Sequence, residues 1–196
     1  MSSAHKCSIG IASFDFEKPK GGLGRALQEM KRALEAGGMS VSLFTPQKHP
    51  WWFASHHVPF SAYVSVVLRA WATCERLNLL LFPVGPGGLF LLRRPLCPCI
   101  AICYHTYLQQ ARSVPGQWWK KVFIPLEVRT LRTADRVLCY SADTRRVLLQ
   151  DYGLPPAHVL LLPQIVDLSP WVPEAPVGRE RGLCVCVARL DVRKGI

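Results

Sequence analysis

The sequence predicts an α/β fold, a Rossmann-like doubly wound parallel sheet. Short apolar runs typical of buried strands alternate with amphipathic helical segments over roughly 165 residues. The first strand is followed by a glycine-rich turn, a helix and a second strand, a crossover that favours parallel pairing. With 196 residues, 49% of them hydrophobic and 19% charged, the chain is long enough for one full domain and a remnant.

The first βαβ unit is predicted in residues 7–46. Residues 7–13, CSIGIAS, form the expected first strand. Apolar residues then recur at helical spacing over residues 23–34, with charged residues between them. Gly37 and Gly38 end this helix, because glycine accepts a left-handed C-terminal cap. The second strand is expected in SVSLFTP.

The same alternation continues along the chain. The further elements expected from it are helices at 61–77, 117–134 and 143–152 and strands at 79–84, 99–104, 136–141 and 158–163. We expect Pro125 to kink or split the second of these helices, because proline lacks an N–H and crowds the preceding turn.

A change of composition after Asp167 predicts a domain boundary. Residues 1–167 are expected to form the first domain, and the proline-rich residues 168–181 an interdomain linker. Residues 182–196 then form the start of a second domain, opening with a buried strand at 183–188. The sequence thus predicts a second domain that is begun and not completed.

The charge of the chain favours anionic partners. Lys and Arg number 24 against 13 Asp and Glu, giving a net charge of +11, and most of the cations occur in scattered pairs. Such a surface attracts phosphates, anionic lipid or nucleic acid. Nucleic acid is not expected as a partner, because the chain has no recognised motif for it and no run of basic residues.

Cysteine usage favours a reducing compartment. Most of the eight cysteines lie inside apolar runs, and the N-terminus lacks the basic start and apolar core of a secretory signal. We therefore expect a cytoplasmic protein. No transmembrane segment is predicted, because prolines and glycines interrupt the apolar residues 78–92.

The glycine-rich turn in KPKGGLGRAL is the first candidate site. Gly21, Gly22 and Gly24 follow the first strand and open a helix, where backbone N–H groups are free to meet a phosphate. The alternative, a tight turn that needs positive φ, is equally consistent with these residues.

His105 is the second candidate. It follows the strand at 99–104, at the carboxyl edge where such sheets bind ligands. A histidine there could contact a phosphate or a sugar hydroxyl, or act near a reacting centre; the alternative is a histidine bonded to the loop backbone. We expect no metal site from Cys97, Cys99, Cys103 and His105, whose spacing is not that of a zinc site.

Two further groups of residues could contact anions. The pairs Trp51/Trp52 and Trp118/Trp119, the second followed by two lysines, are similar to a membrane-surface anchor, although we favour core packing of one ring in each pair. Arg189 and Lys194 bracket a loop after the predicted strand at 183–188, where two cations could neutralise a diphosphate.

In combination these features resemble glycosyltransferase family 4, the retaining, nucleotide-sugar-dependent enzymes of GT-B fold. The matching segments are GGLGRALQEMKRALEAGGMSVSLFTP, CYHTY, TADRVLCYSADTRRVLLQDYGL, HVLLLPQIVDLSPWVPE and CVARLDVRKGI. The family usually has Asn-Gly where this chain has Gln164 and Ile165, a departure expected to alter the domain hinge.

The resemblance implies hexosyl transfer from a nucleotide sugar to an acceptor, with retention. Gly21 and Gly22 would lie near the donor phosphates or the acceptor, and His105 would act as the catalytic residue facing the transferred sugar. Arg189 and Lys194 would grip the diphosphate leaving group, so neither metal nor other cofactor is expected. The acceptor is a saccharide, lipid or small molecule, and peripheral contact with an anionic membrane at the cytoplasmic face is a further expectation.

The rest of the family's second domain has no counterpart in the sequence. We therefore expect a truncated or fragmentary form that transfers sugar slowly or not at all. The alternative is a non-catalytic, Rossmann-like binding domain left from a glycosyltransferase.

Overall fold

The computed structural model describes residues 7–17, 22–48, 56–163, 181–184 and 186–187. The strands in it are β1 (Ser8–Ala12), β2 (Ser40–Phe44), β3 (Leu79–Val84), β4 (Cys99–Cys103), β5 (Arg136–Cys139) and β6 (Val159–Leu161). The α-helices are α1 (Gly22–Ala36), α3 (His57–Cys74), α4 (Tyr107–Ser113), α5 (Ile124–Thr133) and α6 (Ala142–Gln150). Short 3₁₀ helices are η1 (Pro46–Lys48), η2 (Trp118–Phe123) and η3 (Pro156–His158).

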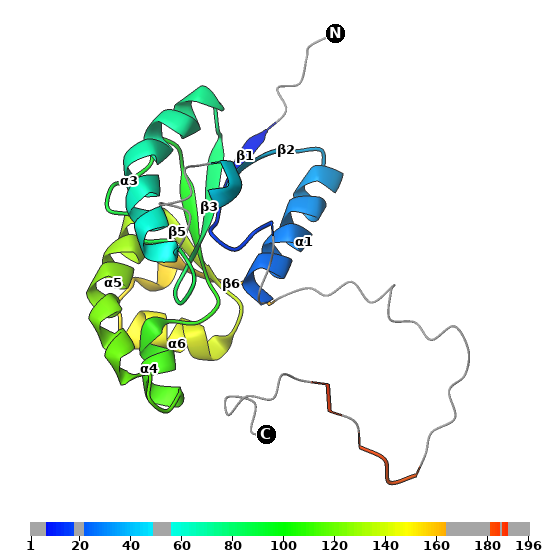
Figure 1. The fold of residues 1–196 in the computed structure, drawn as a ribbon, viewed down its shortest axis with the longest axis vertical. Coiled ribbons are helices and arrows are strands. Elements are labelled where there is room, and N and C mark those ends of the chain that lie inside the picture. The colour runs from blue at the N-terminus through cyan, green and yellow to red at the C-terminus, as the bar shows by residue number, and fades with distance from the viewer. Residues whose placement is uncertain (1–6, 18–21, 49–55, 164–180, 185, 188–196) are drawn as a thin grey trace.

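All six strands join one parallel sheet (Figure 1). Their order is β2-β1-β3-β4-β5-β6, and every neighbouring pair is parallel. The chain moves outward from β1 to β2 and then returns across the sheet to β3, so the order reverses between β1 and β3. This arrangement confirms the doubly wound α/β fold, with its topological switch point between these two strands.

The two faces of the sheet are covered differently (Figure 1). On one face Leu27 of α1 packs with Ile9 and Ile11 of β1. On the other face α3, α5 and α6 pack together over the central strands, and this larger core contains Phe60, Leu131 and Leu148 among its fully buried side chains. The core is thus concentrated on the α3/α5/α6 face.

The helix boundaries differ from those expected. At the start of α3 the difference arises because a capping side chain determines where the helix begins. α3 begins at His57 rather than at residue 61, because the Nδ1 atom of His56 accepts a hydrogen bond from the N–H of Val58 at 3.3 Å. The expected helix 117–134 is divided into η2 and α5. Pro125 lies in the first turn of α5, where its missing N–H costs no helical hydrogen bond.

The loop after β3 crosses between α3 and α5. Phe90 donates its backbone N–H to the hydroxyl of Ser61 on α3 at 3.1 Å. The next N–H, that of Leu91, bonds the Thr130 hydroxyl on α5, also at 3.1 Å. Hydroxyl groups of the two helices therefore satisfy backbone donors that burial would otherwise leave without partners.

Proline ends the pairing of β1 with β3. Their register stops at Ile11 opposite Leu81, and the next rung of a parallel ladder would need the N–H of residue 83 to reach the Ala12 carbonyl. Pro83 has no N–H, and its own carbonyl accepts a bond from Leu89 at 2.7 Å. The ladder between the two strands therefore ends at the switch point.

The buried strand expected at 183–188 is not formed by the residues that the structure describes there. Leu183 and Val187 are 61% and 95% exposed, and neither they nor Cys184 and Cys186 lie in a strand. Strand formation needs a pairing partner, and no described strand pairs with this segment. The expected linker, apart from Arg181, lies outside the described residues, so the domain boundaries remain predictions.

Candidate functional site

The candidate site lies at the carboxyl edge of the sheet. Because all strands are parallel, the loops that follow β1, β3, β4 and β5 meet there. Gly22 is the first residue of α1, after β1, and His105 follows β4 by two residues. Both predicted residues thus lie at the same edge, as expected; that they face one cleft remains a prediction.

The loops after β3 and β4 touch through their backbones. A Cβ atom on Gly85 would lie 2.3 Å from the carbonyl oxygen of His105, and Gly85 has a φ of +104°. A side chain at this position would both strain the backbone and displace His105. Gly85 therefore fixes how closely His105 approaches the end of β3.

A chain of hydrogen bonds determines which tautomer of neutral His105 is favoured. Lys120 donates to Oε1 of Gln110, and Nε2 of Gln110 lies 2.6 Å from Nε2 of His105. An ammonium group can only donate, so it fixes Oε1 as the acceptor and turns the amide nitrogen toward the imidazole. Nε2 of His105 consequently accepts, and the ring proton resides on Nδ1.

His57 adds a second imidazole to this edge. Its ring lies 6.4 Å from that of Phe14, which follows β1, and its Nε2 is 3.4 Å from the Tyr107 hydroxyl after β4. Burial lowers the pKa of His57 to about 4, with the charges of His56 and Lys120 acting in the same direction. His57 is therefore neutral at physiological pH.

A buried carboxyl group accepts a hydrogen bond from the start of α4, after β4. Glu127 of α5 is fully buried, and its oxygens lie 3.1 and 3.2 Å from the N–H of Tyr107. It also accepts a hydrogen bond from the Tyr152 hydroxyl. Burial raises the pKa of Glu127 to about 7, although both hydrogen bonds oppose this shift. The carboxyl group thus joins the start of α4 to the residues after α6.

The glycine-rich turn is described only in part, because Gly21 lies outside the described residues. Gly22 and Gly24 are both helical, and neither has positive φ. The tight-turn interpretation is therefore wrong for these two. None of the described atoms lies within 4 Å of a Cβ placed on Gly22, so there is open space at that position.

The cysteines near His105 do not form a metal site. Cys99 and His105 lie at opposite ends of β4, whose five residues span roughly 16 Å at about 3.3 Å each. Cys103 is fully buried in the core. Across the described residues no three His, Cys, Asp or Glu side chains are placed to hold a metal ion.

The second tryptophan pair corrects another expectation. Trp118 and Trp119 are 72% and 49% exposed, so neither ring is buried in the core. The 3₁₀ helix η2 places them on the surface beside Lys121. Trp51 and Trp52 lie outside the described residues.

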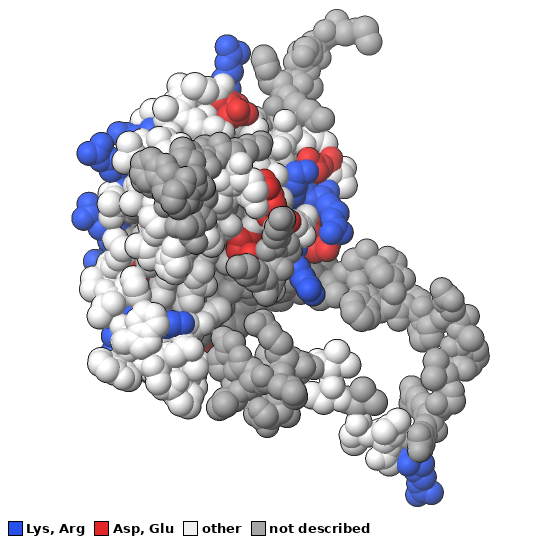
Figure 2. All heavy atoms as spheres, viewed as in Figure 1, with Lys and Arg blue, Asp and Glu red and all other residues white. Residues whose placement is uncertain are grey.

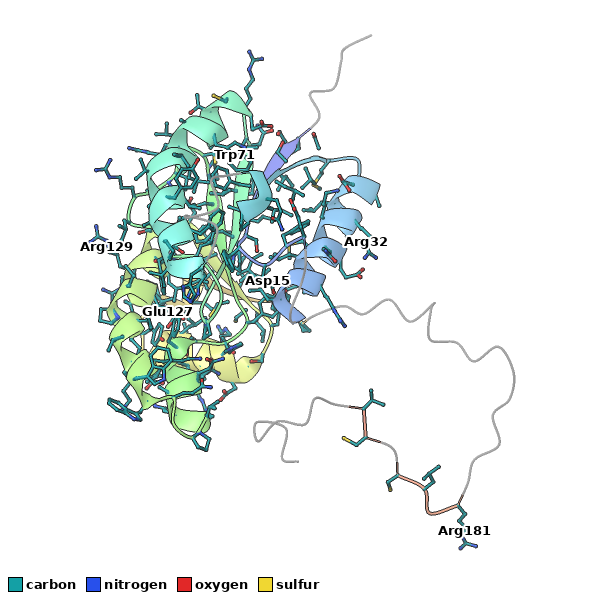
Figure 3. All side chains as sticks on the ribbon, viewed as in Figure 1. Asp15, Arg32, Trp71, Glu127, Arg129 and Arg181 are labelled. Atoms are coloured by element: carbon teal, nitrogen blue, oxygen red, sulfur yellow. The ribbon has the colours of Figure 1, made fainter. Side chains whose placement is uncertain are left out.

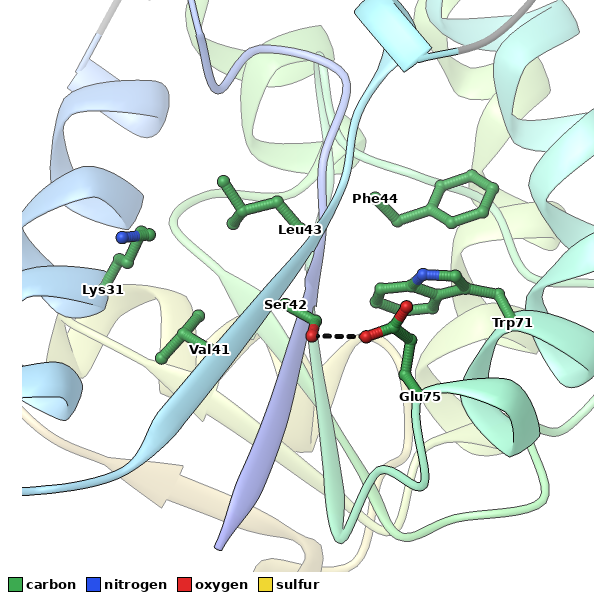
Figure 4. Close-up of a pocket in the computed structure, with 7 residues that line it drawn as sticks. All are labelled: Lys31, Val41, Ser42, Leu43, Phe44, Trp71 and Glu75. Carbon is green, nitrogen blue, oxygen red and sulfur yellow. Dashed lines mark hydrogen bonds between the residues drawn. The ribbon is translucent and has the colours of Figure 1, made fainter. Parts of the chain in front are cut away.

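A separate pocket of about 410 Å³ lies along the outer edge of β2 (Figure 4). Lys31, Val41 and Leu43 line it on the α1 side. On the other side the Ser42 hydroxyl donates to Glu75 at 2.7 Å, beside Trp71. None of the residues predicted for the site lines this pocket.

Comparison with known protein families identifies the family of the chain. The model of Glycosyltransferase Family 4 matches residues 20–170, which include every described element from α1 to β6. The chain belongs to glycosyltransferase family 4. No curated protein matches it. The six-stranded Rossmann-like sheet is accordingly half of a GT-B fold.

The family 4 domain brings together only part of the predicted site. Arg189 and Lys194 lie outside the described residues, as does Gly21, so their roles remain predictions. Sequence reasoning missed His57, Gln110 and Glu127. His57 could have been found from its place after the second strand, in SHHVP at a helix start; the other two emerge only from tertiary contacts.

Within the described residues no helix has the length and hydrophobicity needed to cross a bilayer.

Proposed function

We propose that this family 4 chain acts in hexosyl transfer from a nucleotide sugar to an acceptor, with retention at the anomeric carbon. The observation that carries the proposal is the position of His105 at the carboxyl edge of a family 4 domain, beside the switch point. Ligands of open α/β sheets bind at that place.

At the reacting centre, His105 offers an N–H at Nδ1 toward a hydroxyl of the transferred sugar. The Lys120–Gln110–His105 chain supports this role, because it keeps the donor proton on one nitrogen. His57, at the same edge of the sheet, stays neutral and forms a hydrogen bond with the Tyr107 hydroxyl. It therefore adds a second imidazole to this edge without adding positive charge. The acceptor is an undefined saccharide, lipid or small molecule.

On the donor side, Gly21 and Gly22 approach the phosphates, and Arg189 with Lys194 holds the nucleoside diphosphate that departs. The open space around Gly22 is compatible with a close approach of phosphate to the start of α1. Two fixed cations stabilise the charge that develops on the leaving group, so the proposal includes neither metal nor other cofactor.

We further propose that the protein works in the cytoplasm. All eight cysteines are free thiols, including Cys99, Cys103 and Cys139 in the core. Free thiols persist in a reducing compartment.

The test measures nucleoside diphosphate release from UDP-, GDP- and ADP-linked hexoses by the chain. His105→Ala is expected to lower the rate by about a hundredfold, the usual scale for a positioned acid or donor group. Arg189→Ala is expected to weaken donor use as well. Arg32→Ala on α1 is the control and should leave the rate unchanged. Robust turnover that survives His105→Ala would contradict the proposal.

One observation favours a second candidate, a binding domain without transferase activity. Leu183, Cys184, Cys186 and Val187 come from the strand expected to open the donor domain, and they are exposed and outside any strand. Arg189 lies two residues after Val187 in the sequence. A chain that binds a nucleoside diphosphate by calorimetry but releases none from any nucleotide sugar would support this candidate instead.

A further inference from the structure

Acidic residues are nearly absent from the middle of the chain. Residues 36–134 contain ten Lys or Arg and only two carboxylates, Glu75 and Glu127. Glu127 is fully buried, and Glu75 lies at the end of α3, bonded to Ser42 at the outer edge of the sheet. The outer surface built by α3, η2 and α5 therefore carries positive charge with few acidic groups, Glu75 at the end of α3 and Asp135 just after α5.

The molecule is asymmetric in charge as a result. In Figure 2 the red acidic groups gather toward β2 and α1, whereas the left margin, which α3 and α5 occupy in Figure 1, shows mainly blue and white. On α1 the cations Lys31 and Arg32 are paired with Glu35 and Glu29. On the α5 side one such pair joins Arg94 to Asp135, which lies just after the counted range.

Large apolar side chains are exposed on the same side. Trp118 and Val122 are 72% and 71% exposed on η2, and Trp119 beside them is half exposed. The Trp119 ring meets Phe123 edge-on with centroids 6.0 Å apart, and Phe123 stacks on the buried Phe90 at 5.9 Å. The exposed Trp119 ring is thus connected to the core through Phe123.

Two cations lie among these apolar groups. Lys121 follows the tryptophan pair, and Arg129 projects from α5 on the side away from α1 (Figure 3). The Arg129 guanidinium donates to the carbonyl of Leu92, another exposed apolar residue, at 3.3 Å. None of the described carboxylates forms an ion pair with either cation. We call Leu92, Trp118, Trp119, Lys121, Val122 and Arg129 the η2–α5 surface.

We propose that the η2–α5 surface binds an anionic lipid bilayer. Tryptophan rings settle at the level of the lipid headgroups, aliphatic side chains such as Val122 enter the acyl boundary, and the cations pair with anionic headgroups. Exposed aliphatic groups gain nothing against a nucleic acid backbone. The scarcity of acidic residues reduces the repulsion that an anionic bilayer would otherwise meet.

The inference goes beyond the proposed function and does not depend on it. The two are connected in space, because Lys120 of η2 bonds Gln110, which bonds His105. A bilayer against η2 would therefore lie next to the candidate site, and an acceptor embedded in that bilayer could reach it if the proposed function holds.

The experiment is co-sedimentation of the full chain with vesicles. Binding is expected with phosphatidylcholine mixed with phosphatidylglycerol, with much less binding to phosphatidylcholine alone and weakening by salt. The double variant Trp118→Ser/Trp119→Ser should bind about tenfold less tightly. Circular dichroism checks that the variant is folded. We expect it to be, because both tryptophan side chains are exposed.

A pair of matched charge variants distinguishes binding through the η2–α5 surface from binding that depends only on the net charge of the protein. Arg129→Gln should weaken binding, whereas Arg32→Gln, on the opposite side of the molecule, should not (Figure 3). Equal effects of the two, or no binding to anionic vesicles, would overturn the proposal. The proposal would also be overturned if a duplex oligonucleotide displaced the vesicles and bound the tryptophan double variant as tightly as the parent protein. The assay contains no nucleotide sugar, so failure of the transferase proposal leaves its outcome unaffected.

Discussion

The carbonyl oxygen of His105 lies 2.3 Å from the place that a Cβ atom on Gly85 would occupy. Gly85→Ala is therefore expected to destabilise the protein by about 3 kcal/mol, from positive φ together with a backbone clash that no rotamer relieves. Chemical denaturation measures the loss. The backbone amide resonances of His105 and Thr106 should shift, since the loop after β4 must move.

Gly87→Ala is the matched control for that change. Gly87 also has positive φ, +86°, but a Cβ atom added to it would have no atom within 4 Å, so only the conformational cost of about 1 kcal/mol applies. Equal destabilisation by the two variants would show that the close contact between Gly85 and His105 makes no contribution to the loss of stability.

The tautomer of His105 is expected to depend on residues that do not touch a substrate. In the parent protein the proton should reside on Nδ1, as reported by the ¹⁵N shifts of the imidazole ring. Gln110→Leu removes the donor to Nε2 and should allow the Nε2–H tautomer. Lys120→Met should do so in part, because the Gln110 amide can then turn over. Unchanged shifts in both variants would contradict the assignment.

Glu127 should make stability depend on pH. Its folded pKa of about 7 lies above the value of 4.5 for an ordinary glutamate, so between these values the folded state binds more protons than the unfolded state. The free energy of unfolding should therefore fall as pH rises from 4.5 to 7, by about 3 kcal/mol at most.

Glu127→Gln tests this dependence. The glutamine keeps an acceptor for Tyr152 but cannot ionise, so unfolding measured across the same pH range should give a nearly flat profile. Glu35→Gln, on the exposed surface of α1, should retain the slope. A slope that persists in Glu127→Gln would assign the pH dependence to other groups.

The Thr130 hydroxyl is expected to contribute strongly to the loop between α3 and α5. Thr130→Val conserves shape but leaves the buried N–H of Leu91 without a partner, which costs about 1–3 kcal/mol. Thr133→Val is the control, since the exposed Thr133 hydroxyl bonds only the Arg129 carbonyl on its own helix. Thermal unfolding of the two variants compares them, and a similar small loss in both would be inconsistent with the role of Thr130.

The sheet could be predicted because its strands carry local signals. Residues 79–84 form β3 as expected, since this apolar run is buried on both faces and is bounded by Asn78 and Gly85. The short helix α4 was missed: its seven residues contain too little periodicity, and its start depends on the Thr106 and Gln109 capping box. Local pattern thus identifies the strands better than it identifies helices fixed by caps.

The site was harder to predict for the same physical reason. His105 could be placed because strand order alone sends it to the carboxyl edge. Gln110 and Glu127 act through partners 5 and 20 or more residues away, at distances that the sequence does not encode. The expectation that one ring of Trp118 and Trp119 packs in the core was wrong, because it rested on the general burial of tryptophan and not on their neighbours.

The absent N–H of Pro83 has a lasting consequence for the switch point. Because the missing donor is a covalent property of the residue, the end of the β1–β3 ladder at Ile11 and Leu81 does not depend on pH or on side-chain rotamers. A ligand that binds where the sheet changes direction therefore breaks no backbone hydrogen bond between these two strands beyond that rung.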